Sequence, residues 1–327
     1  MARRSSLAAA LALALAAGLA GTAIAADPPA PSATKPPAPK PAAKRDPLDY
    51  KAQLPKLEAD AQRGDANAAE LLGEIYQAGL GVPRDAQRGC DMFERAANTL
   101  PEAMHNFANC WYWGIGRPRQ PETAAKWYER AIERGFLRSH CALGAQYRHG
   151  IGVPEDKAKG FRLCTQGAEQ GDPDSLAELG EMYLVGDGIP RDYKKAAEML
   201  RRSAEEGQSN AARLLGIMYF NGDGVPKDPN QARDWLMRAA DAGRRDAFLP
   251  LGKLFLAATG DLERGPLNAN LALPALLWLK LASEYDPVLV RRAEAQKLYD
   301  PLAAAAPQLV KQVEPELKPW RTSLGKP

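Results

Sequence analysis

The stretch that decides the fold covers residues 208–243 and reads QSNAARLLGIMYFNGDGVPKDPNQARDWLMRAADAG. Its first half carries apolar residues at helical spacing, and a second amphipathic stripe follows in its second half. The first stripe comprises Ala211, Ala212, Leu214, Leu215, Met218 and Tyr219, and the second comprises Ala232, Trp235, Leu236, Ala239 and Ala240. The stretch therefore predicts two helices, each with one apolar face to bury.

Glycine, proline and aspartate mark the ends of these two helices. Gly222 and Gly224 accept the left-handed conformation that a helix C-cap needs. Asp228 offers a side-chain oxygen to cap the second helix, and Pro229 suits its first turn. Gly216 lies inside the first stripe, where glycine costs about 1 kcal/mol relative to alanine. We therefore expect a neighbouring helix to cross at Gly216 so closely that no side chain fits.

The same pattern recurs along the chain at a nearly fixed spacing. Each copy has an anchor glycine after a leucine, an aromatic residue three positions later, and usually a glycine pair beyond it. The anchor glycines are Gly73, Gly144, Gly180, Gly216 and Gly252, with Ala108 in the slot between the first two. A period of 36 residues separates the last four of them. Such a period is typical of a solenoid, in which stacked units bury one another's apolar faces.

The full pattern, A-x-x-x-L-G-x-x-Y-x-x-G-x-G-V-x-x-D-x-x-x-A-x-x-W-x-x-x-A-A-x-x-G, resembles the Sel1-like repeat family. Five copies match, at residues 65–97, 101–135, 137–171, 172–207 and 208–243, and a degenerate sixth copy starts at Asp246. The resemblance implies an all-α fold, a right-handed α-solenoid of stacked helical hairpins related to tetratricopeptide arrays. It also implies an adaptor or regulator of protein complexes, as family members commonly are, often in bacterial envelopes.

The segments outside the repeats predict export. Residues 1–26 combine a basic start, an apolar run and small residues at the end, which is typical of a signal peptide, with a retained membrane anchor as the alternative. Residues 27–47 are rich in Pro, Ala and Lys and predict a disordered linker, or else a ligand for a proline-binding groove or a tether through the cell wall. We expect a capping helix at 48–64, six repeats within 65–285, and C-terminal capping helices with a tail at 286–327.

Charge and hydropathy exclude two classes of partner. The formal net charge is +3, and it falls to +1 without Arg3 and Arg4. The linker alone carries +2, so the folded body is near −1, which gives no basic footprint for nucleic acid. No later stretch is long and apolar enough to span a bilayer. We expect a periplasmic protein with no integral membrane segment after signal cleavage.

No motif supports catalysis. Some Sel1-like proteins have been described as β-lactamases, but the one S-x-x-K, Ser32 to Lys35, lies in the linker without a preorganised pocket. The chain has no G-x-S-x-G and no H-E-x-x-H. The repeated aspartates Asp85, Asp156, Asp192 and Asp228 are expected to be helix caps. We therefore expect no enzyme activity and no cofactor, with a cell-wall or β-lactam hydrolase as the alternative.

Four cysteines and three histidines all lie between Cys90 and Cys164. An even cysteine count in an exported protein favours disulfides. The repeat register places Cys90 and Cys110 at equal height on neighbouring helices, and Cys141 and Cys164 on either side of one loop. It therefore predicts the pairs Cys90–Cys110 and Cys141–Cys164. A metal site of His105, His140 and His149 with Cys110 or Cys141 matches no ligand spacing, and we expect none.

The predicted binding surface is the concave face built from the first helices of successive repeats. By analogy with tetratricopeptide arrays, its slots lie three before, one after and four after each anchor glycine. They hold Glu70, His105, Asn109, Tyr112, Arg148, Glu181, Arg213 and Lys253.

Trp113 is a further candidate, five residues after its anchor. That slot is expected to be exposed because it holds Ala78, His149, Val185 and Asn221 in other repeats, and an exposed aromatic beside Arg117 and Arg119 suits recognition. Packing against the following loop is the alternative. We hypothesise an exported scaffold for protein partners in the cell envelope. Its rival is a glycan- or peptidoglycan-associated protein, with a hydrolase as one form of it.

Overall fold

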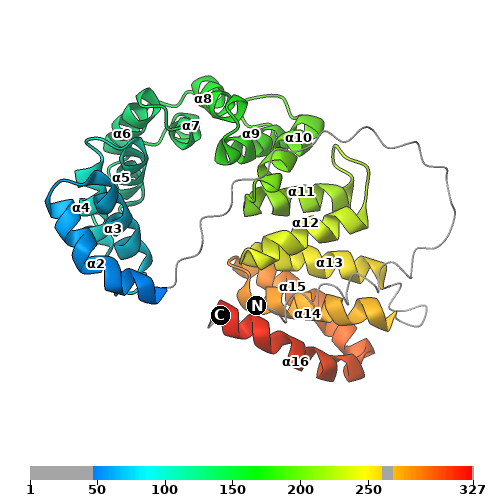
Figure 1. Ribbon diagram of the computed structural model, residues 1–327. Coiled ribbons are helices and arrows are strands. Elements are labelled where there is room, and N and C mark those ends of the chain that lie inside the picture. The colour runs from blue at the N-terminus through cyan, green and yellow to red at the C-terminus, as the bar shows by residue number, and fades with distance from the viewer. Residues whose placement is uncertain (1–46, 260–267, 326–327) are drawn as a thin grey trace, which may run out of the picture. The chain divides into compact units, whose positions relative to one another are not determined.

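The computed structural model describes residues 47–259 and 268–325 of the chain (Figure 1). These residues form 15 α-helices and one short 3-10 helix, and they contain no strand. The all-α prediction is therefore confirmed for the described part of the chain. The expected signal peptide, most of the expected linker and the Ser32 to Lys35 motif lie outside it.

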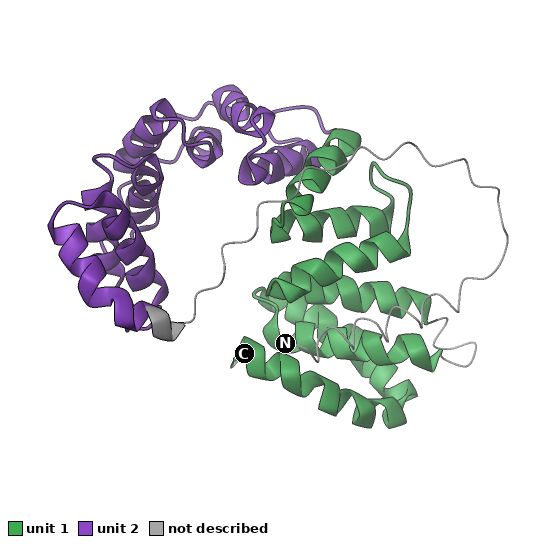
Figure 2. Cartoon of the chain, in the orientation of Figure 1, with its two compact units in different colours: residues 1–26, 192–327 green, residues 27–191 purple. Residues whose placement is uncertain are grey.

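The chain divides into two compact units (Figure 2). Unit 2 covers residues 27–191 and contains eight helices in its described part. These are α2 (Pro47–Gln62), α3 (Ala66–Ala78), α4 (Ala86–Ala96), α5 (Pro101–Trp113), α6 (Pro121–Glu133), α7 (Arg138–His149), α8 (Lys157–Glu169) and α9 (Pro173–Val185). Each packs against the next along the chain. Within this unit the first helices of the hairpins lie on one side, and the second helices lie on the other (Figure 1).

Unit 1 covers residues 1–26 and 192–327, and its described part begins at residue 192. Its elements are α10 (Tyr193–Glu205), α11 (Ser209–Asn221), α12 (Pro229–Asp241), the 3-10 helix η1 (Arg245–Ala247), α13 (Phe248–Ala258), α14 (Ala269–Tyr285), α15 (Leu289–Ala305) and α16 (Pro307–Leu324). Helix α14 packs against α13, α15 and α16. Its Trp278 is fully buried between Phe248 and Trp320, with ring centroids 5.6 and 5.1 Å away.

The helices start and end at the aspartates and glycines that the sequence predicts. The Asp228 side chain accepts hydrogen bonds from the backbone N–H of Asn230 (2.9 Å) and Gln231 (3.1 Å) at the start of α12. Gly222 ends α11 in the left-handed conformation, with φ of 88°. Asp85, Asp156 and Asp192 cap their helices through side-chain bonds in the same way. The predicted capping role of these aspartates is confirmed.

The anchor glycines allow close helix crossings. A Cβ atom on Gly216 would lie 2.7 Å from Cγ of Leu236 on the partner helix α12, which confirms the predicted crossing. In the third repeat both helices carry glycine at the crossing. A Cβ on Gly144 would lie 2.8 Å from the Gly160 carbonyl oxygen, and a Cβ on Gly160 would lie 2.6 Å from that of Gly144. Helices α7 and α8 therefore approach at backbone contact.

None of the helices in the described residues combines the length and the apolarity needed to cross a membrane.

Candidate functional site

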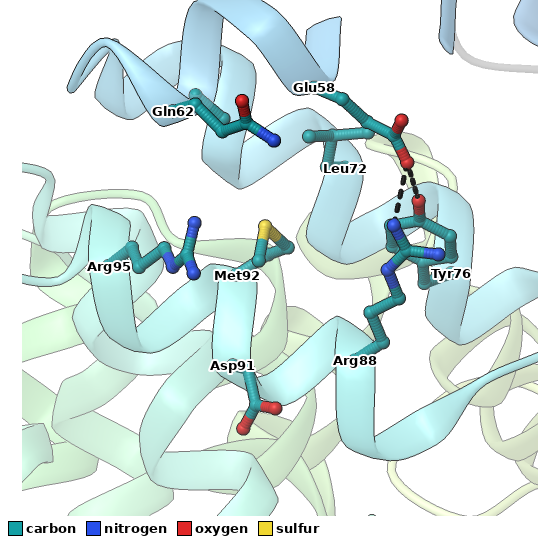
Figure 3. A pocket seen from close by; sticks show the side chains of 9 residues that line it. Glu58, Gln62, Leu72, Tyr76, Arg88, Asp91, Met92 and Arg95 are labelled. Atoms are coloured by element: carbon teal, nitrogen blue, oxygen red, sulfur yellow. Dashed lines mark hydrogen bonds and ion pairs between the residues drawn. The ribbon is translucent and has the colours of Figure 1, made fainter. Parts of the chain in front are cut away.

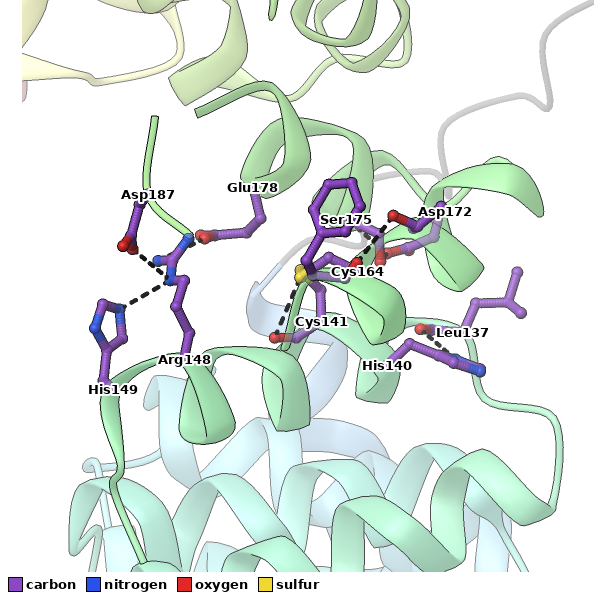
Figure 4. Close-up of a disulfide and its surroundings, with 12 residues drawn as sticks. Leu137, His140, Cys141, Arg148, His149, Cys164, Asp172, Ser175, Glu178 and Asp187 are labelled. Atoms are coloured by element: carbon purple, nitrogen blue, oxygen red, sulfur yellow. Dashed lines mark hydrogen bonds and ion pairs between the residues drawn. A yellow bond between two sulfur atoms is a disulfide. The ribbon is translucent and has the colours of Figure 1, made fainter. Parts of the chain in front are cut away.

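Both predicted cysteine pairs are disulfide-bonded in the structure. Cys90 of α4 pairs with Cys110 of α5, with their Cα atoms 6.1 Å apart. Cys141 of α7 pairs with Cys164 of α8, with their Cα atoms 4.2 Å apart (Figure 4). The first bridge joins two repeats, and the second joins the two helices of one repeat. These bonds fix the helices that carry the candidate binding residues.

His105 is a structural residue in the junction between the second and third repeats. Its ring packs against Tyr128 and Phe136, with centroids 5.4 and 5.2 Å away. Its Nδ1 lies 3.0 Å from the Ser139 hydroxyl. Burial lowers the pKa of His105 to about 4, so the ring is neutral at neutral pH.

The other two histidines have separate partners. Nδ1 of His140 lies 3.1 Å from the Leu137 carbonyl oxygen, and Nε2 of His149 lies 3.1 Å from Nε of Arg148 (Figure 4). The three histidines therefore make different local contacts, and Cys110 and Cys141 are held in disulfides.

Glu70 lies in a group of three glutamates with Glu74 and Glu102, of which the sequence analysis singles out only Glu70. Its side chain is 9% exposed, and its Oε1 accepts a 2.7 Å hydrogen bond from Asn106 of the next repeat. Burial, with smaller contributions from the charges of Glu102 and Glu74, raises the pKa of Glu70 to about 7, although its hydrogen bond with Asn106 acts in the opposite direction. Carboxylate oxygens of the three glutamates lie within 4.8 Å of one another. A group of three carboxylates can attract either a metal ion or a basic side chain, so we assign no metal site to Glu70, Glu74 and Glu102.

Arg148 links the third repeat to the fourth. Its guanidinium lies 3.5 Å from Glu178 and 3.4 Å from Asp187, and its side chain is only 13% exposed (Figure 4). Lys157 of α8 also bonds Asp187 at 3.0 Å, which lowers the pKa of that carboxyl. Four charged side chains from α7, α8, α9 and the loop after α9 thus neutralise one another.

Three other predicted slots also make contacts within the protein. Arg213 lies 3.1 Å from Asp246, and Lys253 lies 2.5 Å from Glu294. Asn109 accepts a 2.6 Å hydrogen bond from the Tyr128 hydroxyl. We call Glu70, His105, Arg148 and Arg213 the interlocked set, because each bonds to the repeat that follows it. Their role in contacting a partner stays a prediction.

The slot of Trp113 is exposed in all five repeats. We call its members the exposed row: Ala78, Trp113, His149, Val185 and Asn221. The side chain of Trp113 is 67% exposed and that of Val185 is 52% exposed. The exposure predicted for this slot is therefore confirmed, and its use in recognition stays a prediction.

Only one of the two arginines expected beside Trp113 lies there. Nε of Arg119 donates to the Tyr112 carbonyl oxygen at 2.9 Å, and the Tyr112 and Trp113 rings meet edge to face at 4.7 Å. Arg117 instead turns inward. Its guanidinium lies 4.7 Å from the Trp111 ring centroid and pairs with a carboxylate of α4. Arg117 therefore contacts the core and α4. The expectation that two arginines lie beside Trp113 is wrong, because only Arg119 lies there.

A cavity of about 270 Å³ lies among α2, α3 and α4 (Figure 3). At its edge, Oε1 of Glu58 accepts hydrogen bonds from the Tyr76 hydroxyl (2.5 Å) and from Arg88 (2.7 Å). Burial, with a contribution from Glu58, raises the pKa of Tyr76 to about 12. The tyrosine therefore stays protonated at neutral pH, and the triad joins α2 to the first repeat. In the sequence, Tyr76 is marked only by its place in the repeat pattern.

The family model and one solved structure agree with this fold. The Sel1 repeat family model matches residues 66–98, 101–136, 137–172, 173–208 and 209–243, more than half of the chain. A Sel1 repeat protein from Oxalobacter formigenes is similar in structure, with a TM-score of 0.59 and 24% identity, over 76% of this chain and 94% of that one. A protective antigen of uropathogenic Escherichia coli has a TM-score of 0.45 and 21% identity, over 85% of this chain and 68% of that one.

A curated relative gives a shorter match. Chitin synthase regulator SKT5 of Malassezia restricta is 31% identical over 120 residues, which is 35% of this chain. The match spans only 8% of the length of that relative. Because the family model covers five consecutive helical hairpins that the structure also shows, the fold is an α-solenoid, and the chain belongs to the Sel1 repeat family.

Proposed function

We propose that this chain is an exported scaffold that binds protein partners along the first-helix side of unit 2. The observation that carries the proposal is Trp113, a tryptophan 67% exposed at the end of α5. Burying a large aromatic ring against a partner contributes more binding energy than most contacts, and tryptophan is enriched at such hot spots. A solenoid presents such residues from successive repeats on one extended surface.

The exposed row and its neighbours supply the contacts in this proposal. Trp113 and Tyr112 form an aromatic centre, and Val185 adds an exposed apolar side chain two repeats further on. Glu181 of α9 lies one turn before Val185 and provides a polar contact. The interlocked set keeps the spacing between these residues fixed. A partner therefore meets a preorganised surface, which lowers the entropy cost of binding.

Two observations support export to the periplasm. All four cysteines are paired in disulfides, which persist in oxidising compartments such as the bacterial periplasm. The sequence of residues 1–26 fits a cleavable signal peptide. The partner is then a protein of the cell envelope. The name of the fungal relative, a regulator of an enzyme, fits an adaptor that acts on another protein.

A pull-down from periplasmic extract tests the proposal. The full chain is compared with Trp113→Ala and with Leu289→Ala, a control that removes an apolar side chain of α15 that is 76% exposed. We expect the wild type and Leu289→Ala to retain the same protein, and Trp113→Ala to lose most of it.

Sedimentation with purified cell wall gives the alternative outcome. Co-sedimentation of the chain with peptidoglycan, without capture of any protein, would favour the glycan-associated reading and contradict the scaffold.

A further inference from the structure

We propose that the start of α15 contacts the surface of an anionic lipid bilayer, with an apolar tip in the headgroup region and arginines beside it. The apolar tip consists of Val288, Leu289 and Val290, which are 43%, 76% and 77% exposed. It belongs to unit 1, whereas the proposed partner surface belongs to unit 2. Either proposal can therefore fail without the other.

The exposure of the apolar tip is not explained by the helix that follows it. Val288 is the N-cap residue of α15 and makes no side-chain capping bond, although polar residues are strongly preferred at that position. Leu289 and Val290 are the first two residues of the helix. Single exposed apolar residues are common, but a contiguous exposed patch marks a site of interaction with a protein or a membrane.

The direction of the apolar tip favours a bilayer over a protein. Side chains of an α-helix tilt toward its N-terminus, so Leu289 and Val290 lean past the first turn of α15. Successive residues also point about 100° apart around the helix, so a flat partner on one side covers only part of the tip. A standard protein interface needs about 800 Å² on each partner, far more than three aliphatic side chains supply. A bilayer that α15 meets end-on surrounds all three.

Two arginines follow the apolar tip directly, and they share one carboxylate. The side chain of Asp286 is fully buried, and its Oδ1 accepts hydrogen bonds from Nε of Arg291 and from the backbone N–H of Val288, both at 2.9 Å. Nε of Arg292 donates to the Asp286 carbonyl oxygen at 2.6 Å. The base of the tip therefore has more positive than negative charge.

A third arginine lies at the same end of unit 1. Arg245 donates to the Leu324 carbonyl oxygen at 2.8 Å, and its guanidinium lies 5.7 Å from the Tyr285 ring centroid. The Tyr285 hydroxyl donates to the Gly325 carbonyl oxygen at 3.0 Å. These contacts place the end of α14, the end of α16 and Arg245 together beside the start of α15. Both partners of Arg245 in these contacts are uncharged.

The acidic side chains near this end are already paired. Glu284 lies 2.6 Å from Arg321 and 3.6 Å from Lys280, and Glu314 lies 3.0 Å from Arg321. Among the side chains joined by these contacts, five cations outnumber three carboxylates: Arg245, Lys280, Arg291, Arg292 and Arg321 against Glu284, Asp286 and Glu314.

This charge fits an anionic bilayer better than a second copy of the chain. Basic side chains close to a membrane attract anionic headgroups, while exposed apolar side chains enter the boundary between headgroups and acyl chains. Two copies that met through their tips would bring two positive ends together, and like charges repel. The observations therefore point to anionic lipid as the occupant.

A nitroxide spin label on the full chain tests the contact. All four cysteines are held in disulfides, so Leu289→Cys supplies one free thiol for the label. We use vesicles of phosphatidylglycerol and phosphatidylcholine in equal parts. The accessibility of the label to a polar nickel complex should fall about tenfold, because an apolar medium excludes that complex. Its accessibility to oxygen should rise, and vesicles of phosphatidylcholine alone should leave it in water.

Two control positions separate insertion of the apolar tip from general adhesion. Val185→Cys places the label at an exposed apolar residue of unit 2, and Lys297→Cys places it at an exposed position further along α15. Both labels should stay accessible to the nickel complex. An anchor within residues 1–26 would hold the chain at the vesicle without burying a label at position 289, so it would not produce the expected pattern.

Three results would overturn the inference. A label at position 289 that stays in water with phosphatidylglycerol present would show that the tip does not enter the bilayer. Equal protection by phosphatidylcholine alone would show that the arginines do not select anionic lipid. Protection without vesicles that disappears on tenfold dilution would assign the tip to a second copy of the chain.

Discussion

The interlocked set and the exposed row lie on the same first helices, yet their side chains have opposite surroundings. Arg148 is 13% exposed and contacts two carboxylates of the next repeat, whereas Val185 at the end of α9 is 52% exposed. The difference comes from position relative to the anchor glycine. The interlocked side chains lie within the helix and contact the following repeat, and the side chains of the exposed row lie at the last helical residue, where they are exposed. Stability and recognition are therefore assigned to different positions of one repeat.

This comparison separates two kinds of position on the predicted binding surface. Four of the eight positions expected to face a groove also bond to the following repeat, as Glu70 and His105 show. The position added because of its variability, Trp113, has the largest exposed ring surface of the candidates. Substitutions at interlocked positions should therefore affect unfolding, and those in the exposed row should affect binding.

The largest expected effect on the free energy of unfolding comes from removing the Cys141–Cys164 disulfide, whose first cysteine occupies a position of the interlocked set. Cys141 lies three residues before its anchor, as Glu70 and His105 do, but it is held covalently by Cys164. Cys141→Ser with Cys164→Ser should lower the free energy of unfolding by about 3 kcal/mol in the loop-entropy model. Urea titration measures it. The Cys90–Cys110 pair closes a loop of similar size and should cost about as much, and a loss below about 1 kcal/mol for both pairs would contradict the account.

The next effect comes from the charged contact between the third and fourth repeats. Arg148→Met leaves Glu178 without its cation, whereas Asp187 keeps Lys157, and it should lower the free energy of unfolding by about 2 kcal/mol. The matched control is Arg162→Met, the same change at an exposed position of α8, which should stay within about 0.5 kcal/mol of the wild type. If Arg148→Met and Arg162→Met changed the free energy of unfolding equally, the interlocked positions would not differ from exposed positions in their contribution to stability.

The pH dependence of stability should report Glu70. Its folded pKa is raised to about 7 from an ordinary 4.5, so the folded state holds this proton more tightly than the unfolded state does. Its contribution is therefore full below pH 4.5 and is lost as the pH rises through 7. Glu70→Gln removes this titration, so it should gain about 1 to 2 kcal/mol on the wild type between pH 5 and pH 8.

Urea titrations at the two pH values measure this gain. Glu129→Gln on α6, at an exposed position, is the control and should follow the wild type. A Glu70→Gln variant whose stability runs parallel to that of the wild type at both pH values would show that Glu70 is not held protonated by its surroundings.

The smallest effect on stability belongs to the exposed row. Trp113→Ala should change the free energy of unfolding by less than about 0.5 kcal/mol, because most of its ring is already in water. Trp127→Ala is the contrasting variant. Its ring packs on Phe107 at 5.0 Å, and its loss should cost at least about 2 kcal/mol. A large loss in Trp113→Ala would support the reading that its ring packs against the following loop.

The local chemistry of the chain allowed much of the fold to be predicted. Asp228, Gly222 and Gly216 determine a helix start, a helix end and a helix crossing through short-range geometry, and the structure has all three. Contacts between repeats were not predictable in the same way. Arg148 meets Asp187 only because successive hairpins stack at a particular angle, and one sequence does not state that angle.

The acidic group shows the same limit. Glu74 and Glu102 lie 28 positions apart in the sequence and come together only through stacking of α3 on α5. Arg117 illustrates a related limit of prediction from sequence. Its guanidinium packs on the Trp111 ring, a contact that the repeat pattern does not predict. The repeat pattern predicted the helices, and the contacts of residues that differ between repeats became known only from the structure.

The central claim is that partners bind to the first-helix side of unit 2, and photo-cross-linking in cells tests it most directly. Benzoylphenylalanine replaces Trp113 or Glu181 on the first helices, or Glu129 on α6 as the control on a second helix. The account predicts cross-linked adducts with an envelope protein from positions 113 and 181 and none from position 129. Adducts from position 129 alone, or equally from all three, would contradict it.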